Sequence, residues 1–244
     1  MKKVAIFVEG QSELIFVRRL LESIIDLNRL SYECFKLHNN DLRKVPYVYR
    51  PINAKVLFLI VNSQGDCEVL TAIKEREKYL FVNGYEKIIG LRDMYCDYYD
   101  KHSHSLISDT VSRRIIENVH KELKKMSQPE KIAIYFSIME LEAWFLSMYS
   151  VFPKINNLLS IEFIEDKLGY NLRDTDPQTK FYRPSIAVKK IFQLCGIKYD
   201  KSNHDIEMIM AKTDKIDFQI ATENGRCRSL SGFYDELKTY DEIK

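Results

Sequence analysis

Apolar and polar positions alternate along the first 150 residues in a pattern that predicts strands separated by helices. Apolar runs of strand length are expected at residues 3–8, 32–37, 55–61, 87–91 and 131–138. Apolar residues at helical spacing predict helices after residue 12 and over residues 67–80, 109–126 and 139–146. Strands separated by helix-length segments favour βαβ units, so we expect an α/β fold with a mainly parallel sheet flanked by helices.

Local signals refine the ends of these elements. Ser12 is expected to cap the first helix and Asp109 the third. Residues 39–53 mix proline, asparagine and charged residues, which predicts a loop. After residue 150 the strand patterns give way to helices, one opened by Pro184 and one over residues 229–237. We therefore expect an α/β domain over residues 1–150 and a helical C-terminal extension over residues 151–244 packed on it.

Composition narrows the class of protein. The chain has 244 residues with a net charge of only +2, which neither requires nor excludes a nucleic-acid partner. Basic pairs at 18–19, 113–114 and 124–125 could meet phosphates, although solvated helix faces are the simpler interpretation. Apolar runs fall short of the ~20 residues of a membrane helix, and the five scattered cysteines never form CxxC. We expect a cytoplasmic protein with no membrane partner, no zinc knuckle and no disulfide framework.

Acidic residues follow three of the predicted strands. They are Glu9 and Glu13, Asp93 and Asp97, and Glu140 and Glu142. In an open parallel sheet, ligands collect at the carboxyl ends of the strands. Clustered carboxylates need a cation, and oxygen ligands favour Mg²⁺ or Mn²⁺, which can polarise a phosphodiester and activate a water.

Each carboxylate also has a structural explanation. The helix dipole favours a Glu in the first turn whatever the function, which accounts for Glu13, Glu140 and Glu142. Asp93 would be a turn residue. Glu9 is the exception, because it interrupts a buried strand at a glycine turn, where a charge is costly unless it is used.

The sequence VAIFVEGQSE at residues 4–13 resembles the opening of a TOPRIM domain, the fold shared by topoisomerases, primases and OLD-type nucleases. In that fold a Glu ends the first strand, and in the OLD-type branch a second acid follows one turn later, which Glu13 matches. The chain, including ELEAWFL at residues 140–146, is similar to a bacterial TOPRIM-like family of RloG type. Members are often encoded near an AAA- or ABC-type ATPase in defence loci. The resemblance is close over residues 3–150 and loose beyond.

This resemblance implies roles for the strand-end acids. Glu9 would be the general acid/base or metal-bridging carboxylate with Glu13 as its companion, and Asp93 would hold the metal. Glu142 would bind a second metal with support from Glu140.

The chain departs from the TOPRIM pattern at the fourth strand. A standard TOPRIM has Asp-x-Asp there, but the second place is Tyr95 and the next acid is Asp97. Strand passage and primer synthesis are therefore disfavoured. A degenerate site that binds metal weakly is an alternative.

The expected function is a nuclease that uses one or two Mg²⁺ or Mn²⁺ ions and water, as the effector of an anti-phage defence pair with an AAA/ABC-type ATPase. The alternative is a weak or inert TOPRIM-like module that binds the ATPase and is regulated by it. A small-molecule phosphohydrolase is a third hypothesis.

Further candidates for phosphate contacts are Arg226 and Arg228, beside a glycine turn at residues 224–225. A tyrosine-rich loop over residues 95–99 suits base stacking or, alternatively, a homodimer contact.

Overall fold

The computed structural model describes residues 1–65, 68–223 and 226–241, and the chain divides into two compact units. Unit 1 comprises Met1–Arg92, Asp109–Phe136 and Glu236–Lys244. Unit 2 comprises Asp93–Ser108 and Ser137–Asp235. Each unit is therefore built from segments that are distant in the sequence.

A six-stranded, mainly parallel sheet has the strand order β3-β2-β4-β1-β5-β6. The strands are β1 (Lys2–Val8), β2 (Leu30–His38), β3 (Asp41–Tyr49), β4 (Val56–Asn62), β5 (Lys87–Asp93) and β6 (Ile132–Ser137). β1 pairs in parallel with β4 and β5, and Val8 lies opposite Asn62 and Leu91. Because β1 is covered on both faces, its residues from Val4 to Val8 are all buried. The predicted α/β class with a mainly parallel sheet is confirmed.

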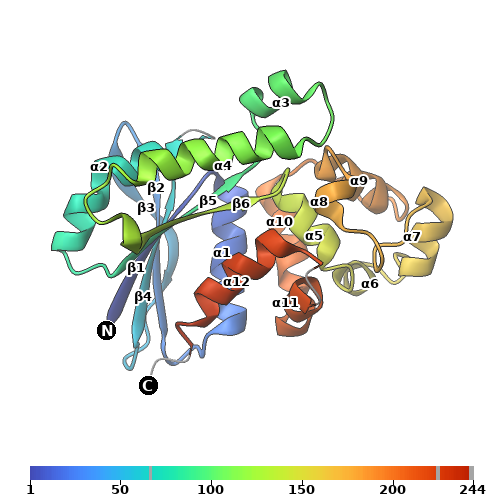
Figure 1. Ribbon diagram of the computed structural model, residues 1–244. Helices are drawn as coiled ribbons and strands as arrows, with labels where there is room; N and C mark the ends of the chain where they lie inside the picture. Colours follow the sequence, from blue (N-terminus) through green and yellow to red (C-terminus); the bar gives the residue numbers. More distant parts are fainter. Residues whose placement is uncertain (66–67, 224–225, 242–244) are drawn as a thin grey trace. The chain divides into compact units, whose positions relative to one another are not determined.

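Helices cover the sheet on both sides. α1 (Gln11–Ile24) and α2 (Glu68–Val82) lie on opposite sides of it, and α4 (Asp109–Leu123) lies beside α2 (Figure 1). Gly90 of β5 allows α2 to approach closely, because a Cβ at this position would lie 3.0 Å from Cγ1 of Val69 and 2.4 Å from Cδ1 of Ile134. The short helix η1 (Pro129–Lys131) leads into β6.

Unit 2 is mostly helical. Its helices are α3 (Asp97–Ser103), α5 (Leu141–Ser147), α6 (Val151–Ile155), α7 (Ile161–Leu168), α8 (Pro177–Lys180), α9 (Pro184–Gln193), α10 (Asn203–Lys212), α11 (Lys215–Thr222) and α12 (Arg228–Lys238). All seven residues of α5 are buried. Trp144 stacks on Phe233 with ring centroids 5.6 Å apart, and its indole N–H donates to Ser229 Oγ at 2.7 Å. Trp144 therefore belongs to the core of unit 2.

Three local predictions were wrong. The segment expected to be a loop forms β3, which pairs with β2 in antiparallel fashion; Pro46 is tolerated because β3 is an edge strand. Gly10, not Ser12, is the N-cap of α1, and the Glu13 carboxylate accepts a hydrogen bond from the Gly10 N–H at 2.8 Å. The tyrosine-rich loop expected over residues 95–99 overlaps α3, which begins at Asp97. The helix predicted from Cys67 begins at Glu68, and Cys67 itself lies outside the described residues.

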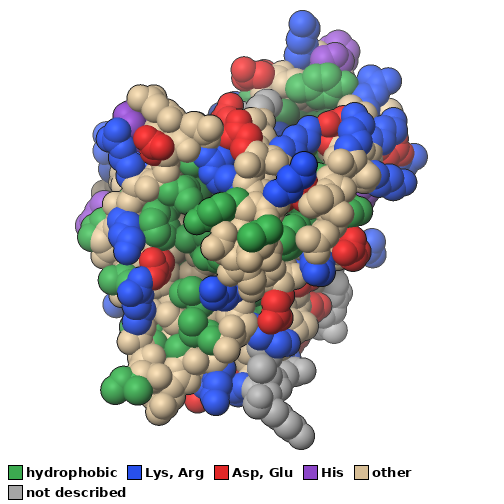
Figure 2. Space-filling model, turned by 90° about the vertical axis from the view of Figure 1, so that its left-hand side faces the viewer, with side chains coloured by type: hydrophobic (Ala, Val, Ile, Leu, Met, Phe, Trp, Pro, Cys, Tyr) green, Lys and Arg blue, Asp and Glu red, His purple; other side chains and the backbone are tan. Residues whose placement is uncertain are grey.

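Part of the sheet face beside α2 is left uncovered. A cavity of about 500 Å³ there is lined by apolar residues that include Phe35, Leu57 and Leu59, with Lys3 and Arg76 also on its wall. Figure 2 shows apolar side chains gathered in the middle of this side of the molecule, with Lys and Arg around them. Among the described residues, no helix has the length and apolar character needed to cross a bilayer.

Candidate functional site

A strained turn places two acidic residues of unit 2. β6 ends at Ser137, and α5 begins four residues later at Leu141. Between them, the fully buried Met139 has a φ of 67°, in the left-handed region that non-glycine residues seldom adopt. Such a conformation persists only where its surroundings enforce it, and the Met139 carbonyl accepts a hydrogen bond from the Tyr95 N–H at 2.7 Å. The turn makes Glu140 the N-cap residue of α5 and puts Glu142 in its first turn.

Both carboxylates are buried and share one cation. The Lys201 ammonium lies 3.0 Å from Oε1 of Glu140 and 3.2 Å from Oε2 of Glu142. The Ser185 N–H donates to the other oxygen of Glu140 at 2.9 Å. Tyr199 donates its hydroxyl to Oε1 of Glu142 at 2.8 Å. The acids therefore tie α5 to the start of α9 and to the turn before α10.

The two acids respond differently to this environment. Burial favours the neutral form of Glu140, but Lys201 and the Ser185 N–H outweigh it and lower the pKa of this carboxyl. Burial dominates at Glu142 and raises the pKa of that carboxyl despite the nearby Lys201. Burial also acts to lower the pKa of Lys201, but Glu142 and Glu140 reverse the effect and raise it. Lys201 is therefore held as a cation between its two partners.

Asp93 belongs to the same cluster of side chains. It is the last residue of β5, and the Ser137 hydroxyl donates a hydrogen bond to its Oδ1. Its charge contributes to raising the pKa of Lys201. Asp97 differs, because it is exposed in the first turn of α3, where the helix dipole favours a negative charge.

The remaining cations and hydroxyls around the acids come from residues that the sequence analysis did not select. The Arg183 guanidinium lies 3.8 Å from Glu140 and packs over the ring of Tyr95, whose hydroxyl accepts a hydrogen bond from it at 2.9 Å. Lys201, Tyr199 and Arg183 are distant in sequence from the acids and fall in no motif, so the sequence carries no signal for them.

The acids of unit 1 have a separate setting. Glu9 follows β1 and is half-buried, and its backbone carbonyl accepts from the Gly65 N–H at 3.0 Å. Glu13 is buried and its carboxylate caps the N-terminus of α1 through Gly10. This capping role provides the structural explanation anticipated for Glu13.

The two arginines considered for phosphate contacts differ in exposure and in their hydrogen bonds. Arg226 donates hydrogen bonds to the carbonyls of Leu172 and Arg173 and packs over the ring of Tyr149. Arg228 is exposed at the start of α12. The glycine turn expected beside them, residues 224–225, lies outside the described residues. Arg226 thus has a structural role in the described part of unit 2.

The structure brings Asp93, Glu140 and Glu142 around one lysine in unit 2 and places Glu9 and Glu13 in unit 1. Over the described ranges, no group of three or more His, Cys, Asp or Glu side chains is arranged to hold a metal ion. The cluster around Lys201 is instead a charge-compensated network, in which an ammonium lies between two carboxylates.

A protein-family model described as Domain of unknown function (DUF4276) matches residues 8–238. The chain belongs to the DUF4276 family. The DUF4276 match extends over most of both units, from the end of β1 to the end of α12, and includes Glu9, Asp93, Glu140 and Lys201. A search of curated proteins gave no match, and a search of solved structures gave none either.

Proposed function

We propose that this DUF4276 protein is a Mg²⁺- or Mn²⁺-dependent phosphodiesterase that cleaves nucleic acid and has a TOPRIM-like fold. The observation that carries the proposal is the presence of acids at the carboxyl ends of parallel strands. Asp93 ends β5, Glu9 follows β1, and the two strands are neighbours in the sheet. This edge of an open parallel sheet is where ligands bind, and carboxylate oxygens suit both ions.

The proposed roles follow from the chemistry of the side chains. Glu9 and Asp93 would supply carboxylate ligands, and Glu13 would be the companion of Glu9 one helical turn later. A bound divalent ion would polarise the phosphodiester and activate a water as nucleophile. Ser137 holds the Asp93 carboxylate in place through its hydroxyl.

Lys201 favours a second candidate function. Because its ammonium already neutralises Glu140 and Glu142, these two acids have less need of a metal. The second candidate is therefore a weak or inert module that is controlled by an ATPase partner. The ATPase partner and a role in anti-phage defence rest on the resemblance to RloG-type proteins and belong to the proposal in either case.

The test uses three single variants of the full chain. Glu9→Ala and Asp93→Asn remove strand-end carboxylates, and Glu86→Ala removes an exposed acid just before the other end of β5 as a matched control. We expect wild type and Glu86→Ala to bind Mn²⁺ in calorimetry and to cleave DNA or RNA. Both other variants should lose cleavage while keeping the wild-type circular dichroism spectrum. Full cleavage by Glu9→Ala would contradict the nuclease assignment. Metal binding by none of the four proteins would favour the inert module.

A further inference from the structure

The outward face of α4 concentrates positive charge in a chain that is nearly neutral overall. One stripe of the helix is buried at a spacing of four residues: Val111, Ile115, Val119 and Leu123. Residues 124 and 125 follow the end of α4, and their N–H groups donate to the carbonyls of His120 and Glu122, which continues the helical turn. Successive residues of a helix are ~100° apart, so residues 113, 114, 121, 124 and 125 fall within an arc of about 120° opposite this stripe. These five are Arg113, Arg114, Lys121, Lys124 and Lys125, and all are exposed. Within residues 109–125, all of them described, Glu117 is the single acid in that arc.

Most of these cations are not neutralised by the protein. Arg113, Arg114, Lys121 and Lys124 form no ion pair within the ranges that the structure describes. Lys125 pairs with Glu122 at 2.5 Å. The other basic pair noted in the sequence behaves differently, because Arg18 is buried and bound to Glu22. Four unpaired cations against one acid on a single helix face are suited to a polyanion.

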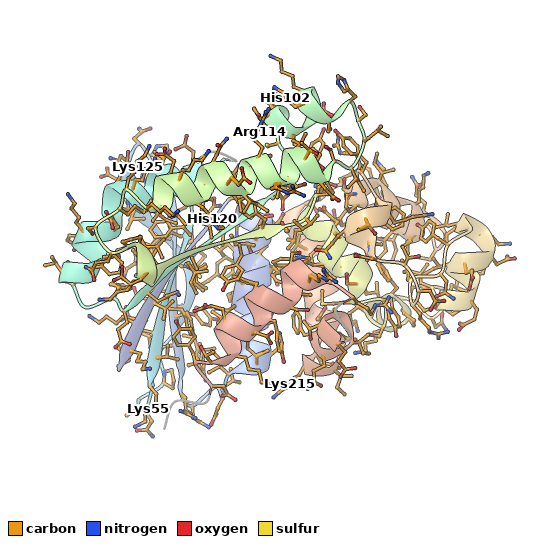
Figure 3. The ribbon with its side chains drawn as sticks, viewed as in Figure 1. Lys55, His102, Arg114, His120, Lys125 and Lys215 are labelled. Atoms are coloured by element: carbon orange, nitrogen blue, oxygen red, sulfur yellow. The ribbon has the colours of Figure 1, made fainter. Side chains whose placement is uncertain are left out.

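Two lysines of α2, Lys74 and Lys78, lie beside this surface. Glu122 also pairs with Lys74 of α2 at 2.5 Å, which fixes the two helices side by side. A groove of about 370 Å³ between them is lined by Lys74, Lys78 and Lys125 and also by the acids Glu77 and Glu122. Figure 3 shows Arg114 and Lys125 on the same side of α4, with His120 on another side. The strip is therefore the outward face of α4 and the turn after it, and the groove beside it carries both signs of charge.

We propose that this strip, residues 113, 114 and 121 of α4 together with 124 and 125 directly after it, binds the phosphate backbone of a nucleic-acid duplex. At ~1.5 Å per residue the strip is about 18 Å long, which matches ~5 base pairs of a duplex carrying one charge per ~1.7 Å. A lipid surface suits it less well, because an amphipathic helix binds a membrane through its apolar face, and that of α4 is buried. The strip shares its partner with the proposed nuclease but does not depend on cleavage.

The experiment measures binding without metal. Fluorescence anisotropy would follow a labelled DNA duplex and the corresponding RNA duplex of about 20 base pairs, in EDTA, over a series of salt concentrations. The test variant is Arg114→Gln/Lys121→Gln/Lys124→Gln, since Gln keeps helix propensity. The control, Lys2→Gln/Lys36→Gln/Lys55→Gln, makes the same change in net charge at exposed lysines of unit 1, and Figure 3 places Lys55 far from α4.

We expect wild type and the control to bind at least one duplex within about threefold of each other, with affinity falling as salt rises. The α4 variant should bind about 100-fold more weakly near ~0.15 M salt, and its log–log salt slope should be smaller by about 3. Equal binding by the two triple variants would overturn the proposal. So would failure of wild type to bind either duplex, including the case in which it binds phosphatidylserine vesicles instead.

Cleavage assays separate this proposal from the nuclease assignment. Glu9→Ala should bind a duplex as wild type does, so loss of cleavage with normal binding supports both proposals. If wild type binds a duplex through α4 but never cleaves nucleic acid, the strip proposal is supported and the nuclease assignment fails. If the α4 variant binds a duplex normally and wild type cleaves, the strip proposal fails and the nuclease assignment is supported.

Discussion

The ammonium of Lys201 lies 3.0 Å from a carboxylate oxygen of Glu140, although 61 residues separate the two in the sequence. The same ammonium contacts Glu142, so one cation compensates two buried acids at the start of α5. Removing it would leave two carboxylates facing each other with little water around them.

Lys201→Met should therefore destabilise unit 2. Breaking a fully buried ion pair costs ~3–5 kcal/mol; because the Lys201 side chain is 40% exposed, we expect about 2 kcal/mol. Urea unfolding followed by circular dichroism measures the change. Lys198→Met, at a side chain that is 83% exposed, is the matched control and should leave the free energy of unfolding close to that of wild type. Equal effects of the two variants would show that the buried network adds no more to the free energy of unfolding than an exposed lysine does.

Glu140 should make stability depend on pH in the acid range. Its pKa is lowered in the folded protein, so its contribution is present above the unfolded value of ~4.3 and is lost as pH falls through the lowered folded value. Compared with Glu140→Gln, wild type should have its largest advantage near neutral pH, and the difference should shrink in acid. Denaturant titrations from about pH 7 to about pH 3 measure this difference.

Glu142 provides the opposite control. Burial raises its pKa, so proton uptake favours the folded state, and the difference between wild type and Glu142→Gln should move with pH in the other direction. The same trend in both variants would contradict the assignment of the two environments.

Gly90→Ala should destabilise unit 1 through overpacking. The new methyl group would overlap Ile134 Cδ1 and press on Val69 of α2. We expect a loss of about 1–3 kcal/mol in the free energy of unfolding. The double variant Gly90→Ala/Ile134→Val removes the nearest methyl and should regain part of this loss. A double variant no more stable than Gly90→Ala would show that the helix, not Ile134, sets the clearance.

Cysteine reactivity should follow burial. Burial raises the pKa of Cys34 to about 12 and of Cys227 to about 11, so little thiolate forms at neutral pH. Among the four described cysteines, which are free thiols, Cys195 is partly exposed and should be alkylated first by iodoacetamide. Peptide mass spectrometry of the native protein resolves the sites, with urea-unfolded protein as the reference. Rapid labelling of Cys34 would imply local opening of β2.

The sequence predicts the parallel part of the fold well because β1, β4 and β5 are buried on both faces and read as continuous apolar runs. β3 escapes prediction because an edge strand exposed on most of its length has no apolar signature, and Pro46 suggests a loop. The acids of the candidate site are visible because they stand at strand ends. Lys201, Arg183 and Tyr199 are not, since only the folding of unit 2 brings them to Glu140 and Glu142.

The edge position of β3 has a consequence for solubility. A strand at the border of a sheet offers unpaired backbone groups on which a second chain could add, which is a common route to aggregation. β3 carries Arg43 and Lys44, and Pro46 lacks an N–H with which to extend the ladder. The charged residues and the proline that make β3 look like a loop in the sequence are thus the residues that oppose aggregation through its free edge.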